Sequence, residues 1–129
     1  MVTKFSTSYL QISVEPKKKC LIQSWIGYCT SEEFRYGQQR SLDIFIEEGC
    51  QNFISDTTDA IPLPEEDVVW VSEVITPKLH KAGMEILNLV VPSSVFTRLT
   101  LEMLEKTDGE INQTPLRFFG SLECALESI

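Results

Sequence analysis

Residues 20–34, CLIQSWIGYCTSEEF, decide the fold class of this chain. Over residues 20–29 large apolar side chains fall on both faces of an alternating pattern, which predicts a strand. Thr30 and Glu33 then have the spacing of a capping box, in which the threonine hydroxyl accepts the amide proton of the glutamate and the carboxylate reaches back. We therefore expect a strand that leads directly into a helix ending near Glu48.

The same order of strand, polar capped start and amphipathic helix recurs along the chain. An alternating strand over residues 9–14 precedes it, and the short polar connection between the two favours an antiparallel hairpin. The further expected elements are a strand at 50–55, a loop at 56–64, a helix broken near Pro77 and ended by Gly83, a strand at 84–91, a helix from Ser93 or Ser94 to about Lys106, a turn at 107–114, a strand at 116–119 and a helix after Ser121.

Alternation of strands and helices requires crossover connections, which produce parallel strands. The prediction is one α/β domain over residues 1–129, in the order β-β-α-β-α-β-α-β-α. Its core is a five-stranded, mixed but mostly parallel sheet packed with helices. Because both faces of the second and fourth expected strands are apolar, the sheet needs either helices on both faces or a second copy of the chain, and we expect a homodimer.

Composition excludes several classes of partner. The net charge of −8 and the pI of about 4.6 argue against nucleic acid and against anionic lipid surfaces, since both require clustered Lys and Arg. No apolar run reaches membrane-spanning length, and the first residues lack the order of a signal peptide. Four cysteines without metal-ligand spacing indicate reduced thiols in a cytoplasmic protein, with two disulfides in a secreted domain as the alternative.

No arrangement of residues is typical of catalysis. His80 is the only histidine, and no nucleophile lies beside it in the sequence. We expect a protein that is not an enzyme and has no metal site and no cofactor. The stretch between Arg40 and Lys78 has no basic residue, which indicates a surface for a basic partner, a weak cation site near Asp56 and Asp59, or simply helix-start and solvated charges.

Four features together resemble the SpoIIAA-like group of STAS domains found in small bacterial proteins. These are TSEEFR after the second expected strand, Asp56 after the third, a Trp-containing helix interrupted by Pro77 and ended by Gly83, and a VVP strand end. The resemblance covers residues 9–129. It implies a non-enzymatic regulatory module that acts through protein–protein interaction.

Regulators of this family carry a phosphorylatable serine in an Asp-x-Ser-Gly turn after the third strand. The resemblance therefore makes Thr57 or Thr58 the candidate phospho-acceptor, and it places Asp56 and Asp59 in a candidate interaction loop. This chain departs from the pattern because it has no Ser-Gly pair, and its next helix begins only after two prolines.

The expected fold is also similar to CRAL-TRIO lipid-binding domains, which implies an alternative function. In that interpretation the chain carries a lipid or another small apolar ligand, in a cleft lined by Trp70, Leu79 and Phe96. The same aromatic and aliphatic residues are more typical of an ordinary core.

Overall fold

Six strands form one mixed sheet in which each strand neighbours the next along the chain. The computed structural model describes residues 1–92 and 94–129, and the side chain of Phe96 is outside that description. The strands are β1 (Val2–Ser6), β2 (Leu10–Glu15), β3 (Cys20–Gly27), β4 (Asn52–Ala60), β5 (Leu87–Val90) and β6 (Leu116–Phe119). The α-helices are α1 (Ser31–Glu47), α2 (Glu65–Trp70), α3 (Thr76–Lys81), α4 (Val95–Ile111) and α5 (Leu122–Glu127). A short 3-10 turn, Pro16–Lys18, joins β2 to β3.

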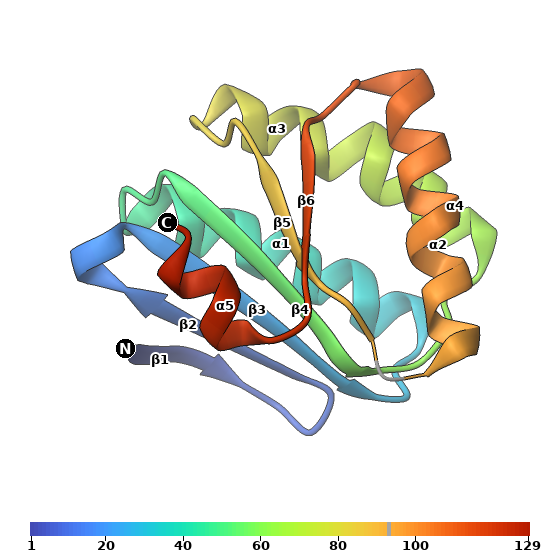
Figure 1. Cartoon of the computed structure of the whole chain (residues 1–129), viewed down its shortest axis with the longest axis horizontal. Helices are drawn as coiled ribbons and strands as arrows, with labels where there is room; N and C mark the ends of the chain where they lie inside the picture. The colour runs from blue at the N-terminus through green and yellow to red at the C-terminus, as the bar shows by residue number, and fades with distance from the viewer. Residues whose placement is uncertain (93) are drawn as a thin grey trace.

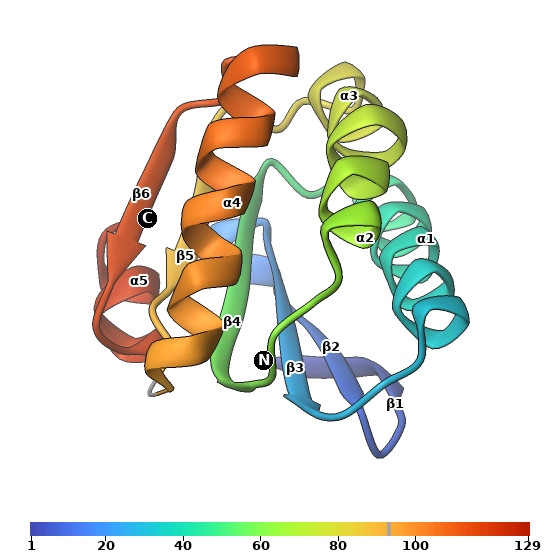
Figure 2. The same cartoon turned by 90° about the vertical axis from the view of Figure 1, so that its right-hand side faces the viewer.

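The direction of the strands determines where the helices lie. The pairs β1–β2 and β2–β3 are antiparallel, whereas the pairs from β3 to β6 are parallel. Each parallel strand is added on the same side of its predecessor, so right-handed crossovers bring every connecting helix to one face. Figures 1 and 2 show α1 to α4 on that face and α5 on the other.

The α/β class and the parallel crossovers are as expected, but the prediction of five strands is wrong. The additional strand is β1, which contains a bulge between Thr3 and Phe5. Val2 and Phe5 pair with Val14 and Ile12, which share one face of β2, so two residues three apart in β1 also share a face. This spacing hides the period of two by which a strand is recognised in a sequence.

Helix starts follow the expected caps. The Thr30 hydroxyl accepts the Glu33 amide proton at 3.1 Å, and the Glu33 carboxylate accepts the Thr30 amide proton at 2.9 Å. Ser94 and Ser121 cap α4 and α5 through their hydroxyls. Gly49 follows α1 with a φ of +63°, a conformation that costs glycine little.

The helix expected to break near Pro77 is divided into α2, a π-helical turn η2 (Val71–Ile75) and α3. At the end of that turn the Thr76 amide and hydroxyl both donate to the Val71 carbonyl, five residues earlier. Pro77, which has no amide proton, then occupies the first turn of α3, where none is needed.

Several expected boundaries are wrong. The strand expected at 84–91 covers only Leu87–Val90. The predicted loop at 56–64 is largely strand, because β4 continues to Ala60 and pairs there with the end of β3 beyond a register shift. The predicted turn at 107–114 begins too early, because α4 includes Asp108 and Gly109. Asp108 is buried and accepts protons from the Asn112 side chain and the Thr114 backbone, so this Asp-Gly pair stabilises the end of a helix.

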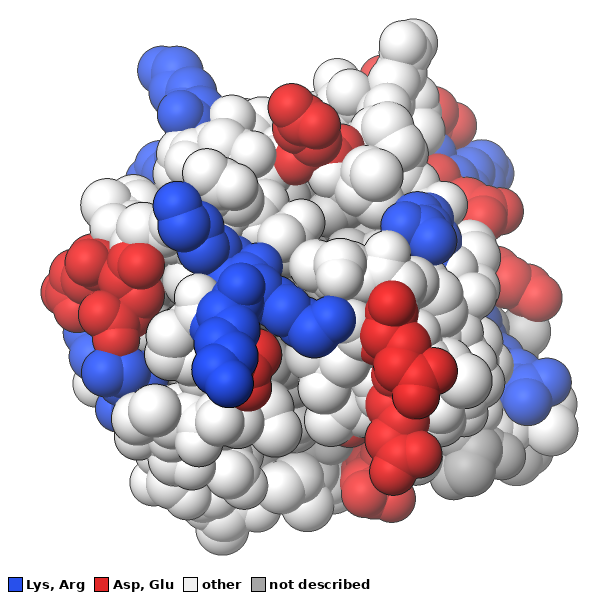
Figure 3. All heavy atoms as spheres, turned by 60° about the vertical axis from the view of Figure 1, so that its left-hand side comes forward, with Lys and Arg blue, Asp and Glu red and all other residues white. Residues whose placement is uncertain are grey.

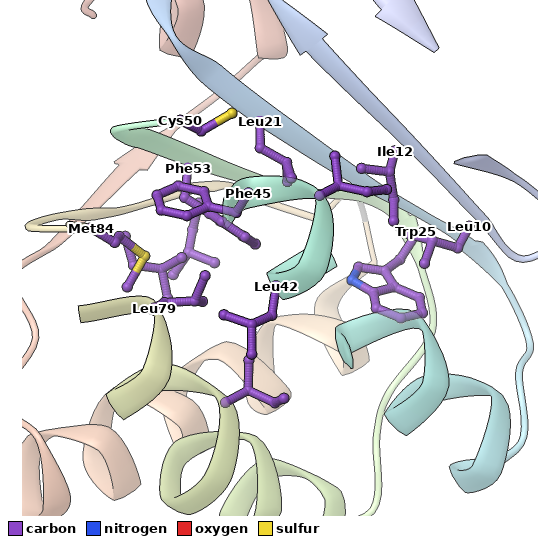
Figure 4. Packing of buried hydrophobic residues seen from close by; sticks show 14 of the residues in the cluster. Leu10, Ile12, Leu21, Trp25, Leu42, Phe45, Cys50, Phe53, Leu79 and Met84 are labelled. Atoms are coloured by element: carbon purple, nitrogen blue, oxygen red, sulfur yellow. The ribbon is translucent and has the colours of Figure 1, made fainter. Parts of the chain in front are cut away.

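Both faces of the sheet are covered by apolar packing. The larger cluster lies between the sheet and α1 to α4, where side chains from both layers point toward one another (Figure 4). A smaller cluster lies under α5 and contains Cys20, Ile22, Ile54, Val90 and Ala125. Helical cover on both faces thus accounts for the two-sided apolar strands, and the homodimer stays a prediction.

Candidate ligand cavity

A partly open cavity of about 90 Å³ lies between the sheet and the helices on its larger covered face. β3, β4 and β5 form one side of it, and α1, α2, η2, α3 and α4 form the other. α4 packs on α2 and η2, and in Figure 2 it runs across β4 and β5. The cavity is therefore bounded by elements that are far apart in the sequence.

Short side chains at facing positions create this space. On β4 the inward residues after Phe53 are Ser55 and Thr57, and on α4 the lining includes Thr97 and Thr100. All four are nearly fully buried. A close-packed interior would place larger aliphatic residues at such positions, so these serines and threonines leave room between the layers.

A buried network of polar side chains forms one wall. The Gln23 amide nitrogen donates to the Gln38 side-chain oxygen at 2.9 Å and to the Ser41 hydroxyl at 2.8 Å, and the Ser55 hydroxyl donates to the Gln23 oxygen at 3.2 Å. Ser41 gives its own proton to the Gly37 carbonyl at 2.9 Å. Since Ser41 must accept from Gln23, the amide orientations of Gln23 and Gln38 are both determined.

Three threonine hydroxyls of the lining bind backbone groups. Thr57 donates to the Val90 carbonyl at 2.6 Å, and Thr97 donates to the Ala60 carbonyl at 2.9 Å. Thr100 accepts the Leu63 amide proton at 3.1 Å. The first two bonds connect β4 to β5 and to α4. The third connects α4 to Leu63, in the segment between β4 and α2.

No ionisable residue is among the described residues that line the cavity. Asp67, a buried carboxylate on α2, is outside the lining. It accepts protons from Ser31 at 2.7 Å and Arg35 at 3.2 Å. The cavity is therefore polar only through amides and hydroxyls.

The residues predicted for an apolar cleft are separated. Leu79 lines the cavity, whereas Trp70 does not and lies under the Arg35 guanidinium at 5.1 Å. The side chain of Phe96 is outside the described part of the structure. Sequence reasoning missed Gln23, although a polar residue between Leu21 and Trp25 on one strand face signals a buried polar contact.

The predicted interaction loop is not a loop, because its four residues belong to β4. Thr57 faces the cavity with its hydroxyl buried, so a kinase could reach it only if β4 separated from β5. Thr58 points to the other face, where its hydroxyl donates to the Asp56 carboxylate at 2.6 Å. Asp59 is exposed near the end of the strand.

The nucleophilic side chains show no sign of activation. Burial raises the pKa of Cys20 to about 12 and that of Cys50 to about 11, so both remain protonated thiols. His80 donates from Nδ1 to the Met84 carbonyl, and its Nε2 is hydrogen-bonded to the Thr114 hydroxyl, both at 2.8 Å. The histidine thereby connects the end of α3 to the segments before β5 and β6.

Searches over the described residues add two observations. No group of three or more His, Cys, Asp or Glu side chains there has the geometry to hold a metal ion. No helix in that part of the chain is long and apolar enough to cross a membrane. The sequence matches no protein-family model, and no curated protein is detectably similar to it, so the functional argument depends on the cavity.

Proposed function

We propose that this chain is a non-enzymatic binding module that holds a small apolar ligand in the cavity beneath α4. The observation that carries the proposal is the cavity of about 90 Å³, lined mainly by apolar side chains, many of which belong to the larger buried cluster. Ligand sites in proteins are typically apolar enclosures with a few polar groups that orient the ligand. The alternative of a ligand carrier, similar to CRAL-TRIO domains, therefore has more support than a phospho-switch.

The volume limits the size of the ligand. An apolar cavity of about 150 Å³ is known to accept benzene, so a space of about 90 Å³ suits a molecule with only a few heavy atoms. A long acyl chain would require α4 to move away from the sheet. The proposal is therefore a small ligand, not a lipid in an extended channel.

Xenon tests the site directly, because it enters apolar cavities without forming hydrogen bonds. Under xenon pressure, we expect methyl NMR signals of Leu79, Met84 and Leu89 to shift, since these residues line the cavity. Ile22 and Ile54, in the cluster under α5, serve as controls and should not shift. Equal shifts on both faces, or none, would contradict the proposal.

Native mass spectrometry tests whether the site is used. The protein purified gently from its own cells should carry the additional mass of a small molecule, which is lost on denaturation. Replacement of Val71, which lines the cavity, by leucine should reduce the fraction of the protein that carries that mass.

Regulation through protein contact is a second candidate, favoured by the exposure of Asp59 and Ile61 where β4 leaves the sheet. Glu65 and Glu66, also exposed, add negative charge close by in the sequence and would suit a basic partner. In the STAS-like interpretation, Thr58 is the more accessible phospho-acceptor. Incubation with serine/threonine kinases should then modify Thr58, and phosphate found only on other residues would contradict this function.

A further inference from the structure

We infer that the ligand of this cavity is an uncharged molecule that carries a hydrogen-bond acceptor, such as the carbonyl oxygen of a ketone, ester or amide. The inference rests on the proposed function, because it describes the chemistry of the same site. It depends on which polar groups in the lining already have partners and which do not.

Charge is excluded by the lining itself. The described lining residues contain no Lys, Arg, His, Asp or Glu, so neither a carboxylate nor an ammonium group would find a countercharge. Burial of an unpaired ion costs far more than a small ligand can recover from its apolar contacts. Fatty acids and amines are therefore poor ligands, although their chains are apolar.

Most polar groups of the lining are already committed. The protons of Ser55, Thr57, Thr76 and Thr97 go to the Gln23 oxygen or to backbone carbonyls. Both protons of the Gln23 amide go to Gln38 and Ser41. These groups hold the walls together and have no remaining proton for a ligand.

Two donors remain. Gln38 is 7% exposed and uses its oxygen to accept from Gln23, and its Nε2 donates to no described residue. Thr100 is also 7% exposed and accepts the Leu63 amide proton, and its own hydroxyl proton has no acceptor among the described residues. Both side chains line the cavity, one from α1 and the other from α4.

A donor that faces a mainly apolar cavity has few other partners, so a ligand that offers an acceptor gains an advantage over one that does not. A carbonyl oxygen supplies that acceptor without charge. A pure hydrocarbon of the same shape would fill the space and leave the donors unpaired. The two donors without an acceptor and the absence of charged lining residues thus both favour an uncharged ligand with a hydrogen-bond acceptor.

Three small probes with equal numbers of heavy atoms separate these possibilities. Acetone has the acceptor, isobutene has the same shape without it, and acetate has a charge. Methyl NMR titration of the whole chain gives a Kd for each, with Leu79 and Met84 as reporters and Ile22 as the control. We expect acetone to bind about fivefold more tightly than isobutene, the ratio expected for one net hydrogen bond, and acetate not to bind.

Matched variants assign the discrimination to a residue. Thr100→Val removes a hydroxyl proton that has no acceptor among the described residues. Thr97→Val, one turn earlier on the same helix, removes a hydroxyl proton that is donated to the Ala60 carbonyl. The ratio of the two Kd values should fall in Thr100→Val and stay unchanged in Thr97→Val. Gln38→Met should lower it too. Because the ratio is measured within each variant, a general loss of stability cancels.

The outcomes distinguish the inference from the function on which it rests. If xenon shifts the cavity methyls but the ketone and the hydrocarbon bind equally, the ligand chemistry is wrong and the binding site stands. Preferential binding of the carboxylate, or an unchanged ratio in both Thr100→Val and Gln38→Met, would likewise overturn the inference. If neither xenon nor any probe shifts these methyls, both proposals are wrong.

Discussion

Gly37 lies on α1 where this helix crosses β2 and β3. A Cβ atom at this position would be 2.6 Å from Leu10 Cδ2 and 2.8 Å from the Trp25 ring, both closer than packed atoms approach. The absence of a side chain therefore allows α1 to approach the sheet.

Gly37→Ala should lower the free energy of unfolding by roughly 1–2 kcal/mol, because overpacking costs more than the gain in helix propensity. Gly109→Ala is the matched control, since Gly109 is also helical and its Cβ would meet nothing within 4 Å. That change should raise stability by roughly 0.5–1 kcal/mol. Urea unfolding measures both, and a stabilising Gly37→Ala would show that α1 does not need this close approach.

The buried thiols give stability a dependence on alkaline pH. Burial raises the pKa of Cys20 to about 12 and that of Cys50 to about 11, each above the ordinary 9.0. Between the ordinary and the raised values the unfolded chain has lost these protons and the folded chain has kept them. The unfolded state therefore binds fewer protons, and stability falls as pH rises above about 9.

Urea unfolding of the wild type should thus show a lower free energy of unfolding at pH 10 than at pH 7. The double variant Cys20→Ala/Cys50→Ala should lose less over the same interval, since it lacks both groups. Parallel curves for the two proteins would contradict the assigned pKa shifts.

Alkylation of the native protein should modify Cys124 first, because this thiol alone among the four is exposed.

Among the elements, α5 is hydrogen-bonded to the turn between β2 and β3 through one lysine. Lys18, in the turn between β2 and β3, donates from Nζ to the Leu126 carbonyl at 2.8 Å and to the Ile129 carbonyl at 3.1 Å. The charge thus lies at the carboxyl end of the helix, where it is favourable.

Figure 3 shows basic and acidic side chains interspersed on one face of the molecule, without a field of one sign across it.

Lys18→Met should loosen α5 and expose the smaller cluster beneath it. Hydrogen exchange of the α5 amides should become about fivefold faster, the effect of losing roughly 1 kcal/mol of hydrogen bonding. Lys17→Met is the control, because the exposed Lys17 side chain makes no such bond to a described residue. Equal exchange in the two variants would mean that apolar packing alone holds the helix.

At the scale of the whole molecule, the sequence was sufficient for the α/β class because its signals are local. A capping box at Thr30 and hydroxyl caps at Ser94 and Ser121 determine helix starts within a few residues. The bulge in β1 and the extension of β4 depend instead on neighbouring strands. A run such as Asp56 to Asp59 looks like a loop until β3 pairs with both of its ends, and β5 pairs only with Asp56.

The cavity was beyond prediction for a related reason. It exists because residues from β4 and α4 are short at positions that face each other, and only the tertiary structure brings those positions together. Leu79 was identified because it is large, apolar and at helical spacing. Gln38 and Thr100 were not, because an inward polar residue acquires meaning only from the partners it has or lacks.

A cavity maintained for a ligand should reduce stability, and filling it should separate stability from binding. Val71→Leu adds a methylene to the lining without removing a polar group. If the space accepts it, the free energy of unfolding should stay equal or rise by up to about 0.8 kcal/mol, and binding of xenon and acetone should weaken. Val74→Leu, on the same π-helical turn but outside the lining, should leave binding unchanged. A Val71→Leu protein of unchanged stability that binds both probes as tightly as the wild type would show that the cavity is not the binding site.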